Sequence, residues 1–121
     1  MKVRLRLAAR PESAGEARRA IALVLGESRL EELLDTTLLL TSEVVTNAVV
    51  HARTELEMIV MVDPPRVRVE VFDDDERCPE MREATDQDAS GRGLMLVEML
   101  AAAWGVRPRQ RGKCVWFEVA V

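Results

Sequence analysis

A long periodic segment between Leu30 and about residue 53 constrains this chain more than any other feature. Apolar or small side chains recur there in steps of three and four residues, at Leu33, Leu34, Thr37, Leu38, Thr41, Val44, Val45 and Ala48. This spacing matches the 3.6-residue repeat of an α-helix that buries one face. It predicts a long helix ending near residues 51–53, with Ser28 as the N-cap and Glu31 completing a capping box.

Strand patterns lie on both sides of this helix. Apolar and polar residues alternate over residues 2–7, 56–62, 67–71 and 115–119. Pro64-Pro65 is expected to turn the central hairpin, and Gly112 is expected to turn a final hairpin whose second strand is 115–119. A second helix is predicted over 14–25, between Pro11 and Gly26. A polar stretch over 73–90 precedes a third helix, which is expected to stop near Gly105. The order β-α-α-β-β-loop-α-β-β predicts an α+β fold, with helices on one face of a mixed, mostly antiparallel sheet.

Length and charge narrow the function classes. The chain has 121 residues, enough for one domain over 1–121, and its 48% hydrophobic content is typical of a globular protein. A formal charge of −4 argues against sequence-independent nucleic-acid binding, which depends on neutralising phosphates. No apolar run approaches the ~18 residues of a membrane helix. Two distant cysteines indicate no disulfide framework, so we expect a cytoplasmic protein that does not act at a membrane.

Glu43 and Asn47 are the first candidate functional residues. They are four residues apart, so they share one helix face beside the apolar stripe. Local helix propensity gives no reason for an asparagine at this position. From spacing alone, a plain pair of polar residues at a helix edge remains the alternative.

Two further segments carry polar groups that could bind a ligand. Asp73 follows a predicted strand, where its carboxylate could accept a hydrogen bond from an exocyclic amine; a solvated acidic turn is the alternative. The acidic run from Asp73 to Glu76 could also hold a hard cation, although no second set of ligands accompanies it. The residues 90–94, Ser-Gly-Arg-Gly-Leu, open a helix and could present free amides to an anion, or simply form a flexible loop end.

Together these segments resemble a known family. The residues 40–52, LTSEVVTNAVVHA, resemble the N-box helix of the GHKL ATP-binding superfamily. The resemblance is closest to its small bacterial branch, the anti-sigma-factor serine kinases and related histidine kinase-like ATPase domains. Asp73, Gly91-Arg92-Gly93-Leu94, and the residues 104–105 and 112–118 follow in the order expected for that branch.

The resemblance implies a two-layer α/β sandwich of the Bergerat type that binds ATP and Mg²⁺. Asn47 would coordinate the metal, Glu43 would act as general base, and Asp73 would bind the adenine amino group. The glycine-rich segment, Gly91, Arg92, Gly93 and Leu94, would close over the phosphates. Such proteins bind a sigma factor, phosphorylate a serine on an antagonist protein, and often form homodimers.

The chain departs from the family pattern in one segment. The usual Asp-x-Gly-x-Gly box is replaced by an acidic, glycine-free stretch over 73–79, in which Cys78 and Pro79 follow the acidic residues. Four acidic side chains near a triphosphate would repel it. A GHKL module that has lost catalysis and regulates its partner by binding alone is therefore the alternative function. Trp104, Trp116 and Phe117 are expected to pack in the core or at its edge.

Overall fold

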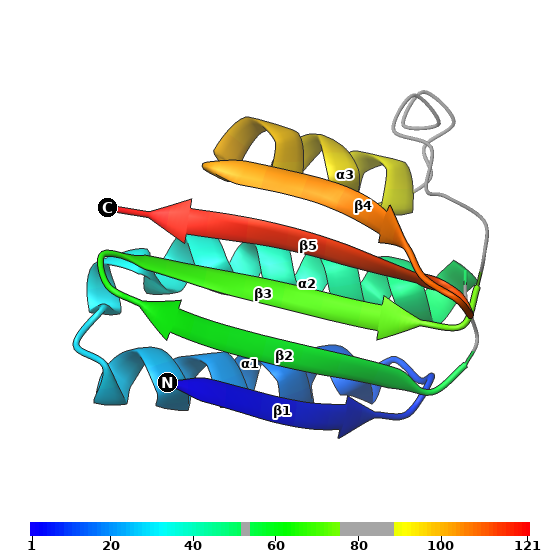
Figure 1. Ribbon diagram of the computed structural model, residues 1–121, viewed down its shortest axis with the longest axis horizontal. Helices are drawn as coiled ribbons and strands as arrows, with labels where there is room; N and C mark the ends of the chain where they lie inside the picture. Colours follow the sequence, from blue (N-terminus) through cyan, green and yellow to red (C-terminus); the bar gives the residue numbers. More distant parts are fainter. Residues whose placement is uncertain (52–53, 76–88) are drawn as a thin grey trace.

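In the part of the chain that the structure describes, five strands form one sheet in the order β1-β2-β3-β5-β4, and three helices cover one of its faces (Figure 1). The computed structural model describes residues 1–51, 54–75 and 89–121. The strands are β1 Lys2–Leu7, β2 Leu56–Asp63, β3 Arg66–Asp73, β4 Ala103–Pro108 and β5 Lys113–Ala120. The helices are α1 Glu12–Glu27, α2 Leu34–His51 and α3 Ala89–Leu100, and the 3-10 turn η1 Glu31–Leu33 leads into α2.

The predicted α+β class and the helices on one face of the sheet are confirmed. Every strand pairing in the described part of the chain is antiparallel. Pro64-Pro65 forms the β2–β3 turn, as expected. Because side chains alternate along a strand, Val67, Val69 and Val71 of β3 all point toward the helices and are buried.

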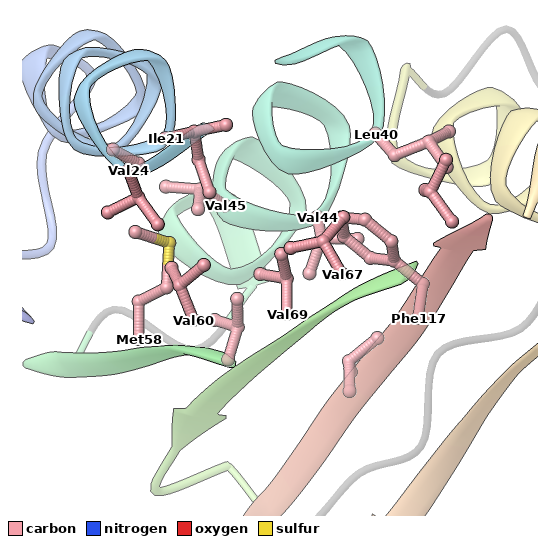
Figure 2. Packing of buried hydrophobic residues seen from close by; sticks show 14 of the residues in the cluster. Ile21, Val24, Leu40, Val44, Val45, Met58, Val60, Val67, Val69 and Phe117 are labelled. Carbon is pink, nitrogen blue, oxygen red and sulfur yellow. The ribbon is translucent and has the colours of Figure 1, made fainter. Parts of the chain in front are cut away.

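The core lies between the sheet and the helices (Figure 2). Ile21 and Val24 of α1 meet Val45 of α2 above the β2 side chains, and Phe117 of β5 closes the other side near Val44. Phe117 is fully buried, and Trp104 packs half-buried against the core, as expected for both. Trp116, by contrast, lies on the open face of the sheet, where the Arg68 guanidinium stacks 4.1 Å from its ring centroid.

The apolar composition of the central helix α2 follows from its position in the core. By length and hydropathy the segment Glu31–His51 could span a membrane, with a mean hydropathy of 1.3, so the expectation that no segment would qualify is wrong. In this fold α2 packs between α1 and α3 and buries one side in the core. A core helix meets the same criteria as a membrane helix because both are rich in apolar residues.

Two predicted helix signals between α1 and α2 are wrong. Gly26 does not stop α1, which runs on to Glu27, and Ser28 caps the end of α1 rather than the start of α2. The Ser28 amide donates to the Val24 carbonyl, so this residue is already committed to the preceding helix. The reversal occurs one residue later, at Arg29, which has a φ of 59°. The chain then enters α2 through η1 with no side-chain cap at Leu30.

The third helix also differs from its prediction at both ends. It begins at Ala89 and stops at Leu100, so Gly105 lies within β4 instead of ending the helix. Gly105 has a packing role there: a Cβ on it would approach Trp116 Nε1 at 3.0 Å, closer than ordinary packing allows. A side chain at this position would therefore require the Trp116 indole to shift by a few tenths of an ångström.

The helix core contains two hydroxyls whose replacement should stabilise the protein. Thr37 and Thr41 are fully buried, and neither hydroxyl has a hydrogen-bond partner among the described residues. Thr41→Val keeps the shape and removes the desolvated oxygen, so we expect the free energy of unfolding to rise by about 1 kcal/mol. Urea denaturation measures this, with the exposed Thr46→Val as control. A Thr41→Val protein less stable than the parent would contradict the prediction.

Candidate functional site

The segments singled out by the sequence meet at one end of the molecule. The C-terminal end of α2, the end of β3 and the start of α3 all lie on the right in Figure 1. A hydrogen bond joins two of them directly: the Asp74 amide, just after β3, donates to Thr54 Oγ1, which follows α2, at 3.3 Å. The topology thus brings together residues that are far apart in the sequence.

Glu43 and Asn47 lie one turn apart on α2, the helix whose C-terminal end lies at this end of the molecule. Asn47 is 7% exposed, although it carries a polar amide, whereas Thr46 beside it is exposed. Glu43 is half-buried. The amide thus borders the buried stripe formed by Val44 and Ala48, as the helical spacing predicted.

Asp73 is the most deeply buried acidic residue of the site. It continues the helix-facing row of β3, and only 1% of its surface is exposed. Its Oδ1 accepts hydrogen bonds from Lys113 Nζ at 3.1 Å and from the Asp75 amide at 2.8 Å. Its Oδ2 is buried and has no hydrogen-bond partner in the described part of the chain. The solvated-turn alternative therefore fails for Asp73 and holds only for Asp74, whose side chain is 53% exposed.

Sequence reasoning missed Lys113. This lysine pairs in register with Asp73 across β3 and β5, and the two side chains form a buried ion pair, 6% and 1% exposed. The sequence did contain a signal for this burial. Lys113, Val115 and Phe117 are every second residue of one strand, so their side chains point to the same face, and that face is the core. A buried charge needs a partner of opposite sign.

The acidic run does not assemble a metal site of its own among the described residues. Within 1–51, 54–75 and 89–121, no three acidic, histidine or cysteine side chains gather in a way that could hold a metal. The Lys113 ammonium instead contacts the Asp73 carboxylate and the Asp75 carbonyl, at 3.1 and 3.2 Å. Glu76, Arg77, Cys78 and Pro79 of the predicted glycine-free segment lie outside the described residues.

The predicted phosphate segment belongs to a helix rather than to a loop before it. The backbone of Gly91, Arg92, Gly93 and Leu94 lies in the first turns of α3, which begins two residues before Gly91, at Ala89. The first four amides of a helix lack partners within it. Gly91 belongs to that set, whereas Arg92, Gly93 and Leu94 come after it.

Other features at this end lie on the opposite face of the sheet. A shallow polar pocket there is lined by Glu57, Phe72 and Arg109, among others. Since Glu57 and Phe72 alternate with core residues, this pocket does not face α2. Cys114 is buried on the same face, and burial raises the pKa of its thiol to about 11, so it is a poor nucleophile near neutral pH.

Comparisons with known proteins agree with this arrangement. A family model described as a histidine kinase-like ATPase domain matches residues 7–119. One similar solved structure is the histidine kinase domain of the blue-light activated histidine kinase from Erythrobacter litoralis EL346, at 25% identity and a TM-score of 0.55. The match covers 91% of this chain and 60% of that one. A search of curated proteins finds no match. The chain belongs to the histidine kinase-like ATPase domain family of the GHKL superfamily.

Proposed function

We propose that this domain binds ATP with Mg²⁺ and transfers the γ-phosphoryl group to a serine of an antagonist protein in a sigma-factor partner-switching system. Membership in the family supports nucleotide binding. The resemblance to the small anti-sigma-factor branch supports the protein substrate and the sigma factor as partners. The matched histidine kinase domain is longer than this chain, which spans 60% of its length.

The unpartnered Asp73 Oδ2 is the observation that carries the proposal. A buried carboxylate oxygen without a donor is costly, and a ligand N–H would relieve that cost. The 6-amino group of adenine supplies such a donor. The 6-oxo group of guanine or hypoxanthine is an acceptor and would meet the carboxylate unfavourably.

The other candidate residues suit the triphosphate end of the same ligand. The Asn47 amide oxygen is a ligand type that Mg²⁺ accepts, and the metal usually takes few protein ligands beside phosphates. The leading amides of α3, with that of Gly91 among them, suit phosphate oxygens. When bound, ATP would supply the transferable phosphoryl group, and Mg²⁺ would neutralise the negative charge of the phosphates. These residues would bind and orient, which is most of what phosphoryl transfer requires.

Glu43 is the proposed general base. Its carboxylate would take the proton from the serine hydroxyl of the antagonist while that oxygen bonds to the γ-phosphorus. The bond between the γ-phosphorus and the β,γ-bridging oxygen breaks, and ADP leaves with that oxygen. A half-buried carboxylate one turn before Asn47 on the same helix face is suitably placed relative to a metal-bound phosphate.

Titration calorimetry and phosphate labelling test this assignment. We expect the parent protein to bind ATP with Mg²⁺, and radiolabelled ATP to label serine on a protein encoded beside it. Glu43→Gln should bind ATP as the parent does but transfer phosphate about 100-fold or more slowly, since it lacks the base. Glu16→Gln, half-buried on the neighbouring helix α1, is the matched control.

The outcomes separate the two candidate functions. A Glu43→Gln protein that still labels its partner at the parental rate would remove Glu43 as the base. A parent that binds ATP but labels none of its neighbours would favour the binding-only module, which the exposed acidic Asp74 also favours because it repels phosphate. A parent that binds no nucleotide would overturn the proposal altogether.

A further inference from the structure

The β4–β5 hairpin closes onto the end of β3 and holds Asp73 by its backbone. Arg109, in the hairpin loop, donates from Nη2 to the Asp73 carbonyl oxygen at 3.3 Å and pairs with Asp74 at 3.5 Å. Gly112 has a φ of +86°, and a Cβ on it would collide with the same Asp73 carbonyl. Lys113 follows at once and is the direct cross-strand partner of Asp73. The backbone of Asp73 therefore has little freedom.

The Asp73 side chain is also held in place, through one of its two carboxylate oxygens. Lys113 Nζ and the Asp75 amide both donate to Oδ1, and Lys113 Nζ also donates to the Asp75 carbonyl. These bonds fix the plane of the carboxylate. The second oxygen, Oδ2, is left buried without a donor among the described residues. The asymmetry comes from the Lys113 ammonium and the Asp75 amide, which both donate to the same oxygen.

We propose that Lys113 is a positioning residue that makes Asp73 select the nucleobase; this rests on the proposed ATP-binding function. By occupying Oδ1, the ammonium leaves Oδ2 as the one acceptor available to a ligand N–H. The pair therefore prefers a base with a 6-amino group over one with a 6-oxo group. Without the ammonium, the carboxylate keeps only the Asp75 amide as a donor to Oδ1, and its rotation is less restricted.

The geometry requires a lysine rather than any cation. An ammonium is a point charge that can contact one oxygen, whereas a guanidinium presents a planar fork that binds both carboxylate oxygens. An arginine at position 113 would preserve the ion pair but engage Oδ2. The chain contains 17 basic residues, and Lys113 and Lys2 are its two lysines, so an ammonium at this buried position stands out.

The test compares ATP with inosine triphosphate, which has a 6-oxo group, using Lys113→Arg. Calorimetry in Mg²⁺ measures both affinities for the parent, for Lys113→Arg and for the exposed control Lys2→Arg. We expect the parent and Lys2→Arg to prefer ATP by about 100-fold or more. Lys113→Arg should fold, because the charges stay paired, and should lose most of this preference, to within about tenfold.

Lys113→Met provides a second route to the same readout. It removes the ammonium while keeping the apolar length of the side chain, and its ATP preference should also fall. Retention of the parental ratio by Lys113→Arg or by a folded Lys113→Met would overturn the positioning role. A parent that binds both nucleotides equally would also overturn it. A parent that binds neither would instead refute the proposed function, so the two failures are distinguishable.

Discussion

Replacing Asn47 by alanine is expected to abolish Mg²⁺-dependent ATP binding and to leave the fold intact. The loss in affinity should be on the order of 100-fold or more, because the amide oxygen is the proposed protein ligand of the metal. Alanine favours a helix more than asparagine does, so α2 loses no intrinsic stability. Asn47 borders the core with a short side chain, and its removal leaves the large apolar contacts of the helix in place.

Calorimetry with and without EDTA tests this prediction. In Mg²⁺ the parent should bind much more tightly than Asn47→Ala, whereas in EDTA the two should bind ATP equally weakly. The neighbouring exposed Thr46→Ala should behave like the parent in both conditions. An Asn47→Ala protein with parental affinity in Mg²⁺ would exclude this residue as a metal ligand.

Gly112→Ala is expected to destabilise the protein more than any other single methyl-sized change considered in this chain. Two penalties combine at this position: a φ of +86°, which is unfavourable for alanine, and a collision between the new Cβ and the backbone of Asp73 and Asp74. Each strained feature of this kind costs about 1–3 kcal/mol, so we expect a loss of about 3 kcal/mol or more. Chemical denaturation followed by circular dichroism measures it.

Gly26→Ala is the matched control for this change. Gly26 lies in α1, and a Cβ there would have no neighbouring atom within 4 Å. Alanine should therefore stabilise the helix by about 0.5–1 kcal/mol. Because Gly112 lies against the carbonyl of Asp73, Gly112→Ala should also weaken ATP binding at temperatures where it remains folded. A Gly112→Ala protein as stable as the parent would contradict the described hairpin geometry.

Much of the fold could be predicted because its elements are strongly periodic. The α2 stripe and the alternating residues of β2, β3 and β5 each match one period over most of their length. The errors concerned where helices begin and end. They involved Ser28, Gly26 and Gly105, and both residue types occur in several structural contexts. A serine can cap a helix start or simply end the preceding helix, and a glycine can end a helix or admit a neighbouring ring. Spacing alone does not distinguish these uses.

The candidate site could be predicted only in part. Motif order singled out Glu43, Asn47 and Asp73 as candidates, and the structure brings the C-terminal end of α2 and the end of β3 to one end of the sheet. The roles of the three residues stay predictions. The burial of Asp73 and the loss of the solvated-turn alternative could not be predicted, because aspartate is common in turns and Asp74 and Asp75 follow it. The effect of the glycine-free stretch 73–79 on nucleotide binding stays a prediction from the sequence, since residues 76–79 lie outside the described part of the chain.

The amino-acid sequence by itself determined which stretches are helices and strands and which polar residues border the core, because these depend on local periodicity. The tertiary structure decided the pairing of Asp73 with Lys113, which lies 40 residues later. That contact depends on β5 lying beside β3 in one register, and a shift of one residue would turn Lys113 to the open face. A buried carboxylate with one occupied and one free oxygen is thus a property of the assembled sheet, and no local pattern encodes it.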